Sequence, residues 1–178
     1  MLKLETILEN SLTQPKDCNA ALVVGDGKVF WGRGAGACNL AYNKTAGEIC
    51  FNTSLTGYQE ILTDPSYAGQ IITFTFPHIG NVGTNNEDLE SFAPTINGCV
   101  FGVDITEPAN WRASQHLDNW LKSHKIPAIT GIDTRHLTRR IRDNGFVNGV
   151  IAYSDTAPID IQIAYEAAKS CPKLEGRD

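Results

Sequence analysis

Apolar and polar positions alternate with a period of two through much of the first half of the chain, the pattern of half-buried β-strands. Residues 20–34 predict two strands joined at Asp26-Gly27, a dipeptide typical of hairpin turns. Further strands, rich in β-branched and aromatic residues, are expected within residues 48–54, 69–80 and 98–106. The intervening segments are small or polar and predict loops at residues 35–47 and 81–91.

Near Trp111 the apolar period changes from two to 3.6 residues, which predicts helices. Ser114 is expected to cap the first helix, whose apolar face carries Leu117, Trp120 and Leu121. Strands are then expected within residues 126–132 and 148–154.

A second helix should begin at Asp133 or Thr134, bury Leu137 and Ile141, and end at Gly145. A third is expected from about residue 158 to residue 170. Strands in the first half, and strands alternating with helices in the second, predict a mixed α/β domain in which helices cover one side of a sheet system.

The first 19 residues read as an extension that precedes this domain, which spans residues 20–178. Within the extension, apolar residues recur at helical spacing, so a short amphipathic helix and an irregular tail both remain open; these residues are Leu4, Ile7, Leu8 and Leu12. The extension has acidic residues and no continuous apolar run, so it does not resemble a secretory signal.

The composition is that of an ordinary globular protein. The chain has 178 residues, 42% hydrophobic and 20% charged, which suffices for one domain with a real core. A net charge of −5 argues against a nucleic-acid partner. The one basic cluster, residues 135–142, is interpreted as a solvated helix face. No apolar run approaches the roughly 20 residues that cross a bilayer, so no membrane partner is expected.

Five cysteines are present, widely spaced and without a C-x-x-C pair, so neither a zinc site nor a redox motif is expected. They are Cys18, Cys38, Cys50, Cys99 and Cys171. Cys50 and Cys99 lie inside apolar strands and should be inert core residues, and the other three lack an activating turn. The sequence therefore predicts no catalytic residue, metal site or cofactor in this chain, and its free thiols favour the reducing cytoplasm.

The four histidines also lack a metal-binding spacing. Three of them, His116, His124 and His136, lie on predicted helices and are expected at the surface. His78 lies just past a strand end, where functional side chains often occur. From the residues alone, a structural role for His78 is favoured over a functional one.

Residues 53–69 are too irregular for a core and carry turn chemistry. Asp64, Pro65 and Ser66 suit the first three positions of a β-turn, which would present the Ser66 hydroxyl at a fixed place. Such a hydroxyl can close its own turn by bonding nearby backbone, or it can bind a ligand.

Two long blocks carry a family resemblance. Residues 47–88, "GEICFNTSLTGYQEILTDPSYAGQIITFTFPHIGNVGTNNED", resemble the small, glutamine-hydrolysing subunit of carbamoyl-phosphate synthetase. Residues 132–151, "IDTRHLTRRIRDNGFVNGVI", resemble a second block of the same N-terminal domain, and the likeness runs from about Ala20 to the end.

The resemblance implies a β/β/α domain of the "swivelling" type that packs on a C-terminal glutamine amidotransferase domain with a Cys-His-Glu triad. Ammonia released from glutamine passes through a tunnel to a large subunit. That subunit makes carbamoyl phosphate from bicarbonate and two ATP, for pyrimidine and arginine synthesis. The implied partners are thus the large subunit, the amidotransferase domain of the same protein, and L-glutamine.

This sequence departs from the family pattern at three places. It carries no amidotransferase elbow and ends at "LEGRD", about where the family's linker begins, so this chain alone is expected to be inactive. Its first residues extend beyond the usual start, and residues 36–47 form a longer loop.

The resemblance also implies a role for Ser66, because the family's matching serine reaches the glutamine site from across the domain boundary. Tyr58, Gln59 and Glu60 would then pack and position this turn. An alternative function is a stand-alone, non-catalytic module that binds a synthetase-like partner.

Overall fold

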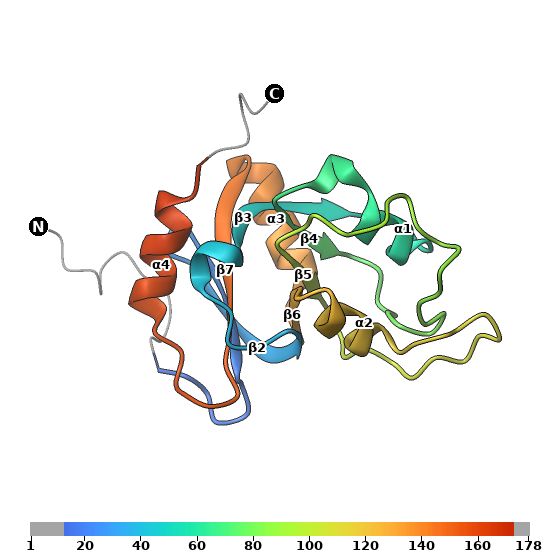
Figure 1. The fold of residues 1–178 in the computed structure, drawn as a ribbon. Coiled ribbons are helices and arrows are strands. Elements are labelled where there is room, and N and C mark those ends of the chain that lie inside the picture. Colours follow the sequence, from blue (N-terminus) through green and yellow to red (C-terminus); the bar gives the residue numbers. More distant parts are fainter. Residues whose placement is uncertain (1–12, 173–178) are drawn as a thin grey trace, which may run out of the picture.

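The computed structural model describes residues 13–172 and consists of a closed barrel of seven strands with helices around it (Figure 1). Around the barrel the strands follow the order β1-β2-β6-β5-β4-β3-β7. Their bounds are β1 Ala20–Val24, β2 Val29–Gly36, β3 Ala46–Asn52, β4 Gln70–Phe74, β5 Gly98–Phe101, β6 Pro127–Thr130 and β7 Val147–Tyr153. The apolar residues expected at helical spacing between Leu4 and Leu12 lie outside the described residues.

Within residues 13–172, four α-helices and two short 3₁₀ helices accompany the strands, and α4 follows the last strand. Their bounds are η2 Tyr42–Lys44, α1 Tyr58–Thr63, η3 Pro65–Tyr67, α2 Leu117–Ser123, α3 Thr134–Asn144 and α4 Ile161–Ser170. The three helices expected in the second half are therefore confirmed, whereas α1 was not expected.

The barrel combines two kinds of strand pairing. β3, β4, β5 and β6 pair in parallel, and β1, β2 and β7 close the ring with antiparallel ladders. The expected mixed α/β domain is confirmed, but the sheet closes into a barrel, which the sequence did not predict, so its outer surface faces in every direction. Helices therefore pack on different parts of that surface.

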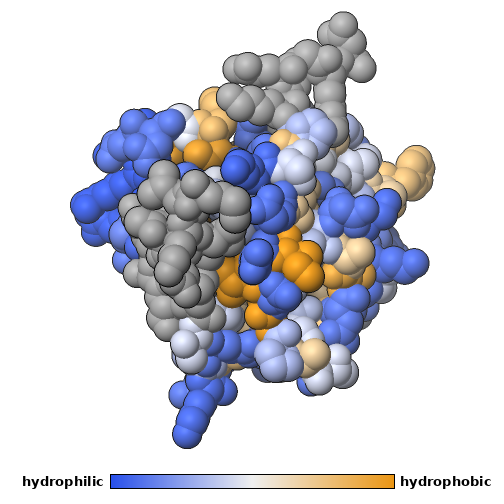
Figure 2. Space-filling model, turned by 90° about the vertical axis from the view of Figure 1, so that its left-hand side faces the viewer, coloured by the Kyte–Doolittle hydropathy of each residue, from blue (hydrophilic) through white to orange (hydrophobic). Residues whose placement is uncertain are grey.

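All seven strands send apolar side chains into the barrel, among them Leu22, Ile71 and Ile151. α3 adds Leu137 and Ile141 to this interior cluster. Both faces of the apolar strand β1 are buried. Alternate residues point into the barrel, and the residues between them point outward and pack beneath α4. Figure 1 shows α4 on one side of the barrel, and Figure 2 views the molecule from that side, where apolar patches lie among hydrophilic side chains.

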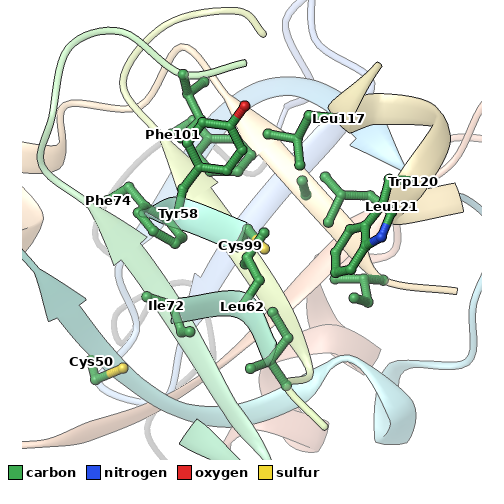
Figure 3. Packing of buried hydrophobic residues seen from close by; sticks show 14 residues of the cluster. Cys50, Tyr58, Leu62, Ile72, Phe74, Cys99, Phe101, Leu117, Trp120 and Leu121 are labelled. Carbon is green, nitrogen blue, oxygen red and sulfur yellow. The ribbon is translucent and has the colours of Figure 1, made fainter. Parts of the chain in front are cut away.

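A second outer cluster lies between the parallel strands and the helices α1 and α2 (Figure 3). Ile72 and Phe101 project outward from the barrel into it, Leu62 comes from α1, and Leu117 and Trp120 come from α2. This cluster fixes α1 against the barrel and so determines where the following turn, η3, can lie.

The start of α2 differs from the sequence-based expectation. Ser114 is not its cap, because the backbone around Ser114 bonds to Thr84: the Ser114 N–H donates to the Thr84 carbonyl at 2.8 Å. The helix begins two residues later than a Ser114 cap would allow, and the His116 Nδ1 accepts from the Asp118 N–H at 3.1 Å instead.

Candidate functional site

The predicted turn around Ser66 is present as η3, between α1 and β4. The Asp64 side chain caps it by accepting from the Ser66 N–H at 2.8 Å, and the Tyr67 N–H donates to the Asp64 carbonyl at 3.1 Å. Pro65 occupies the first position of the 3₁₀ helix, where its fixed φ suits the turn. The backbone of Ser66 is therefore held on both sides.

Ser66 itself is exposed. Its N–H and then its hydroxyl lower the pKa of the Asp64 carboxyl, because both stabilise the carboxylate. The side chain thus contributes to its own turn while it faces the surface. While the hydroxyl donates to Asp64, its lone pairs can accept from a ligand, and its proton can bind a ligand only by leaving Asp64.

The end of the turn is held by two hydrogen bonds, one to the last residue of strand β3 and one to the loop before β5. The Tyr67 hydroxyl accepts from Asn52 Nδ2 at 3.1 Å, and the Gly69 N–H donates to the Thr95 carbonyl at 2.9 Å. Gly47 lets Gly69 approach closely, since a Cβ at Gly47 would lie 2.3 Å from the Gly69 carbonyl oxygen. Ser66 is therefore presented from a rigid turn and not from a loose loop.

The helix before the turn is joined to the second conspicuous loop of the sequence. The buried Tyr58 hydroxyl donates to the Gly83 carbonyl, and the buried Gln59 side chain exchanges two hydrogen bonds with the Asn85 backbone. Tyr58 and Gln59 thus pack and position the segment, as the sequence predicted. Glu60 is half-buried at the same helix.

Thr63 continues this connection at the other end of α1. Its hydroxyl accepts from the Glu90 N–H at 2.9 Å, and its carbonyl accepts from the Ser91 hydroxyl at 2.6 Å. The sequence analysis expected Gln59 to position the turn but did not predict its buried partner, and it missed Thr63 as an anchoring residue. Their only sequence signal is the helical spacing of Tyr58, Ile61 and Leu62, little more than one turn long.

A cavity of about 210 Å³ opens beside the start of α1 and not beside Ser66. Glu60 and Asp88 contribute carboxylates to its lining, together with Tyr58 and Gln59. Ser66 is not among the lining residues, so the structure does not bring it and this cavity together.

Three of the cysteines have a shifted thiol pKa, and in each of them the shift is upward. Cys50 and Cys99 are buried, as predicted; burial raises the pKa of the Cys50 thiol to about 12 and raises that of Cys99 as well. Burial and then the nearby Asp155 carboxylate raise the pKa of Cys38. These environments favour the neutral thiol, whereas a nucleophile requires the thiolate.

The four histidines lie in different segments and differ in exposure. His116 is half-buried at the start of α2, whereas His124 and His136 are exposed. His78 is exposed and makes an edge-on contact with Phe76, with ring centroids 5.9 Å apart. Among residues 13–172, no group of three or more His, Cys, Asp or Glu side chains is arranged to hold a metal ion.

No helix within the described residues is long and apolar enough to span a membrane.

Comparison with known proteins gives a consistent result. The protein-family model described as carbamoyl-phosphate synthase small chain, CPSase domain, matches residues 22–151 of this chain. The chain is 52% identical over 163 residues to the carbamoyl phosphate synthase small chain of Rhizobium meliloti (strain 1021), covering 89% of this chain and 40% of that protein. It is 52% identical over 173 residues to the corresponding small chain of Bartonella quintana (strain Toulouse), covering 94% of this chain and 42% of that protein. The chain thus spans about two-fifths of the length of these relatives.

Proposed function

The chain belongs to the carbamoyl-phosphate synthase small chain family, through its CPSase domain, and from this premise we propose that it serves glutamine-dependent synthesis of carbamoyl phosphate. In this proposal, residues 20–178 form the N-terminal domain of the small chain, and residues 1–19 form an extension. The catalytic amidotransferase domain corresponds to the length of the relatives that this chain does not cover.

The proposed reaction divides between two chains. The amidotransferase domain hydrolyses L-glutamine, and the ammonia travels to a large chain that combines it with bicarbonate at the expense of two ATP. The observation that carries the proposal is the family match over residues 22–151, which includes the complete turn around Ser66.

Ser66 is proposed to contact glutamine across the domain boundary. Three features support this role: the hydroxyl is exposed, its backbone is fixed by Asp64 and Pro65, and the turn is tied to the barrel through Tyr67. A hydroxyl can donate to the α-carboxylate of glutamine or bond its side-chain amide. Pre-positioning reduces the entropy that binding would otherwise cost.

The chain by itself is proposed to be inactive toward glutamine. Amide hydrolysis by a thiol requires a thiolate, and the environments of Cys38, Cys50 and Cys99 raise their thiol pKa values.

The test uses two preparations. A full-length small chain that contains these residues, assembled with its large chain, should make carbamoyl phosphate from glutamine, bicarbonate and ATP. The 178-residue chain alone should release no ammonia from glutamine above background. The proposal is contradicted if the assembled protein fails with both glutamine and ammonia as nitrogen source, or if the 178-residue chain hydrolyses glutamine and a Cys→Ser change abolishes that activity.

A further inference from the structure

Trp111 is 91% exposed at the surface, although indole is among the costliest side chains to leave in water. The other two tryptophans behave differently: Trp120 is buried and Trp31 is half-buried. We propose that Trp111 is the anchor by which this domain docks on the large chain, entering an apolar pocket rimmed by basic side chains. The inference rests on the proposed function for the identity of the partner.

The backbone presents Trp111 at the corner of a closed turn. The Ala113 N–H donates to the Asn110 carbonyl at 3.0 Å, and the Arg112 N–H donates to Asn110 Oδ1 at 2.9 Å. Trp111 therefore occupies the second position of a four-residue turn. At this position the side chain points away from the residues that precede and follow the turn.

The turn that carries Trp111 is held in place by contacts with the loop at residues 81–91. The Ala109 N–H donates to the Asn81 carbonyl at 2.9 Å, and an isolated antiparallel bridge pairs Thr84 with Gln115. The loops also approach so closely that a Cβ at Gly83 would lie 2.6 Å from the Ala113 Cβ. An exposed aromatic side chain on so constrained a support loses little entropy on binding, which is the property of an interface hot spot.

The neighbouring charges determine the chemistry of the partner. Arg112 is paired with two carboxylates, since its Nη2 lies 3.0 Å from Glu87 and 2.7 Å from Asp88. Glu107 adds a third carboxylate four residues before Trp111, with its side chain 92% exposed. His116 Nε2 lies 3.7 Å from Glu107, so three carboxylates stand against one guanidinium and one imidazole; this surface keeps a negative balance, and a complementary pocket carries Lys or Arg at its rim.

The place of Trp111 favours a separate chain over the continuation of this one. α4, the last described helix, lies on one side of the barrel, whereas the loops that follow β4 and β5 extend from the opposite side (Figure 1). α4 therefore lies on the side of the barrel away from the loop that carries Trp111. Two copies related by a two-fold axis would bring two acidic surfaces together, which disfavours symmetric self-association.

The test measures binding of the purified large chain to the full-length small chain that contains this domain, by titration calorimetry at low and at physiological salt. The Trp111→Ala variant is compared with Ile163→Ala, which removes a 59% exposed apolar side chain from α4 on the opposite side. Trp111→Phe is the conservative variant. Circular dichroism and urea unfolding check that each variant folds as the wild type does.

We expect Trp111→Ala to raise the Kd for the large chain at least tenfold, Trp111→Phe to raise it less, and Ile163→Ala to leave it within twofold. Binding of the wild type should weaken as salt increases, because the rim charges are screened. Equal affinity of Trp111→Ala and the wild type would overturn the docking role and leave the proposed function intact. Failure of the wild type to bind the large chain would overturn the proposed partner, and the docking role with it.

Discussion

Gln59 and the backbone of Asn85 are joined by two hydrogen bonds that run in opposite directions. Gln59 Nε2 donates to the Asn85 carbonyl at 2.6 Å, and the Asn85 N–H donates to Gln59 Oε1 at 2.9 Å. Gln59 is only 3% exposed, so water cannot replace either bond. This pair fixes α1, and with it the turn that carries Ser66, to the loop that precedes Asp88.

Gln59→Ala should therefore destabilise the fold more than an ordinary loss of side-chain contacts. Leaving a buried donor or acceptor unpaired costs about 1–3 kcal/mol per group, so the free energy of unfolding should fall by roughly 2 kcal/mol or more. Urea unfolding followed by circular dichroism measures the change. Gln162→Ala is the matched control, because Gln162 is exposed on α4 and its loss should change stability by less than about 0.5 kcal/mol. Equal loss in the two variants would contradict the anchoring role of Gln59.

The thiols should divide into two classes in the native protein. Cys50 and Cys99 are buried and have raised pKa values, whereas the other three are half-buried. With a thiol reagent at pH 8, Cys50 and Cys99 should react only after unfolding, and all five cysteines should react in denaturant. Mass spectrometry after brief labelling identifies the modified residues. Rapid labelling of Cys99 in the folded chain would show that the cluster between the barrel and α2 opens readily.

Asp104 should make stability depend on pH in the acidic range. The Thr130 hydroxyl and then Arg33 hold the pKa of this carboxyl below its usual range. Because the folded pKa is lower than the unfolded value of about 3.9, the contribution is complete above about pH 5 and is lost as pH falls through the folded pKa. The carboxylate is largely exposed, so its contribution is modest.

Asp104→Asn should accordingly lower the free energy of unfolding at pH 7 by roughly 0.5–1 kcal/mol. The difference between variant and wild type should begin to shrink as the pH falls below about 5 and continue to shrink as the pH passes through the lowered folded pKa. Urea titrations at a series of pH values provide the measurement. A difference that stays constant from pH 7 to pH 3 would mean that the carboxylate charge plays no part.

The sequence predicted the strands and the three later helices because each has a local signal. The apolar period marks the strands, and residues such as Asp133 and Gly145 mark the ends of α3. Closure of the barrel has no such signal. It depends on ladders between segments far apart in the chain, such as the pairing of Arg33 with Thr130.

The candidate site was predictable to a similar extent. The Asp64-Pro65-Ser66 turn follows from local chemistry and is present. The bonds that hold it were not predictable, since Gln59 and Thr63 are polar residues that only the folded chain buries. In the sequence Trp111 marks the point where the apolar period changes, and its exposure depends on contacts with a second loop that the local sequence does not reveal.

The most direct measurement of the central claim compares glutamine and ammonia as nitrogen sources for Ser66→Ala in the full-length, two-chain enzyme. A hydrogen bond to a charged group contributes roughly 1.5–3 kcal/mol, and about 1.4 kcal/mol corresponds to tenfold in affinity. The KM for glutamine should therefore rise by roughly tenfold or more, while ammonia-dependent synthesis stays nearly unchanged because ammonia bypasses the glutamine site. Ser123→Ala, an exposed serine on α2, should alter neither activity. An unchanged KM for glutamine, or an equal loss with both nitrogen sources, would contradict the proposed contact between Ser66 and glutamine.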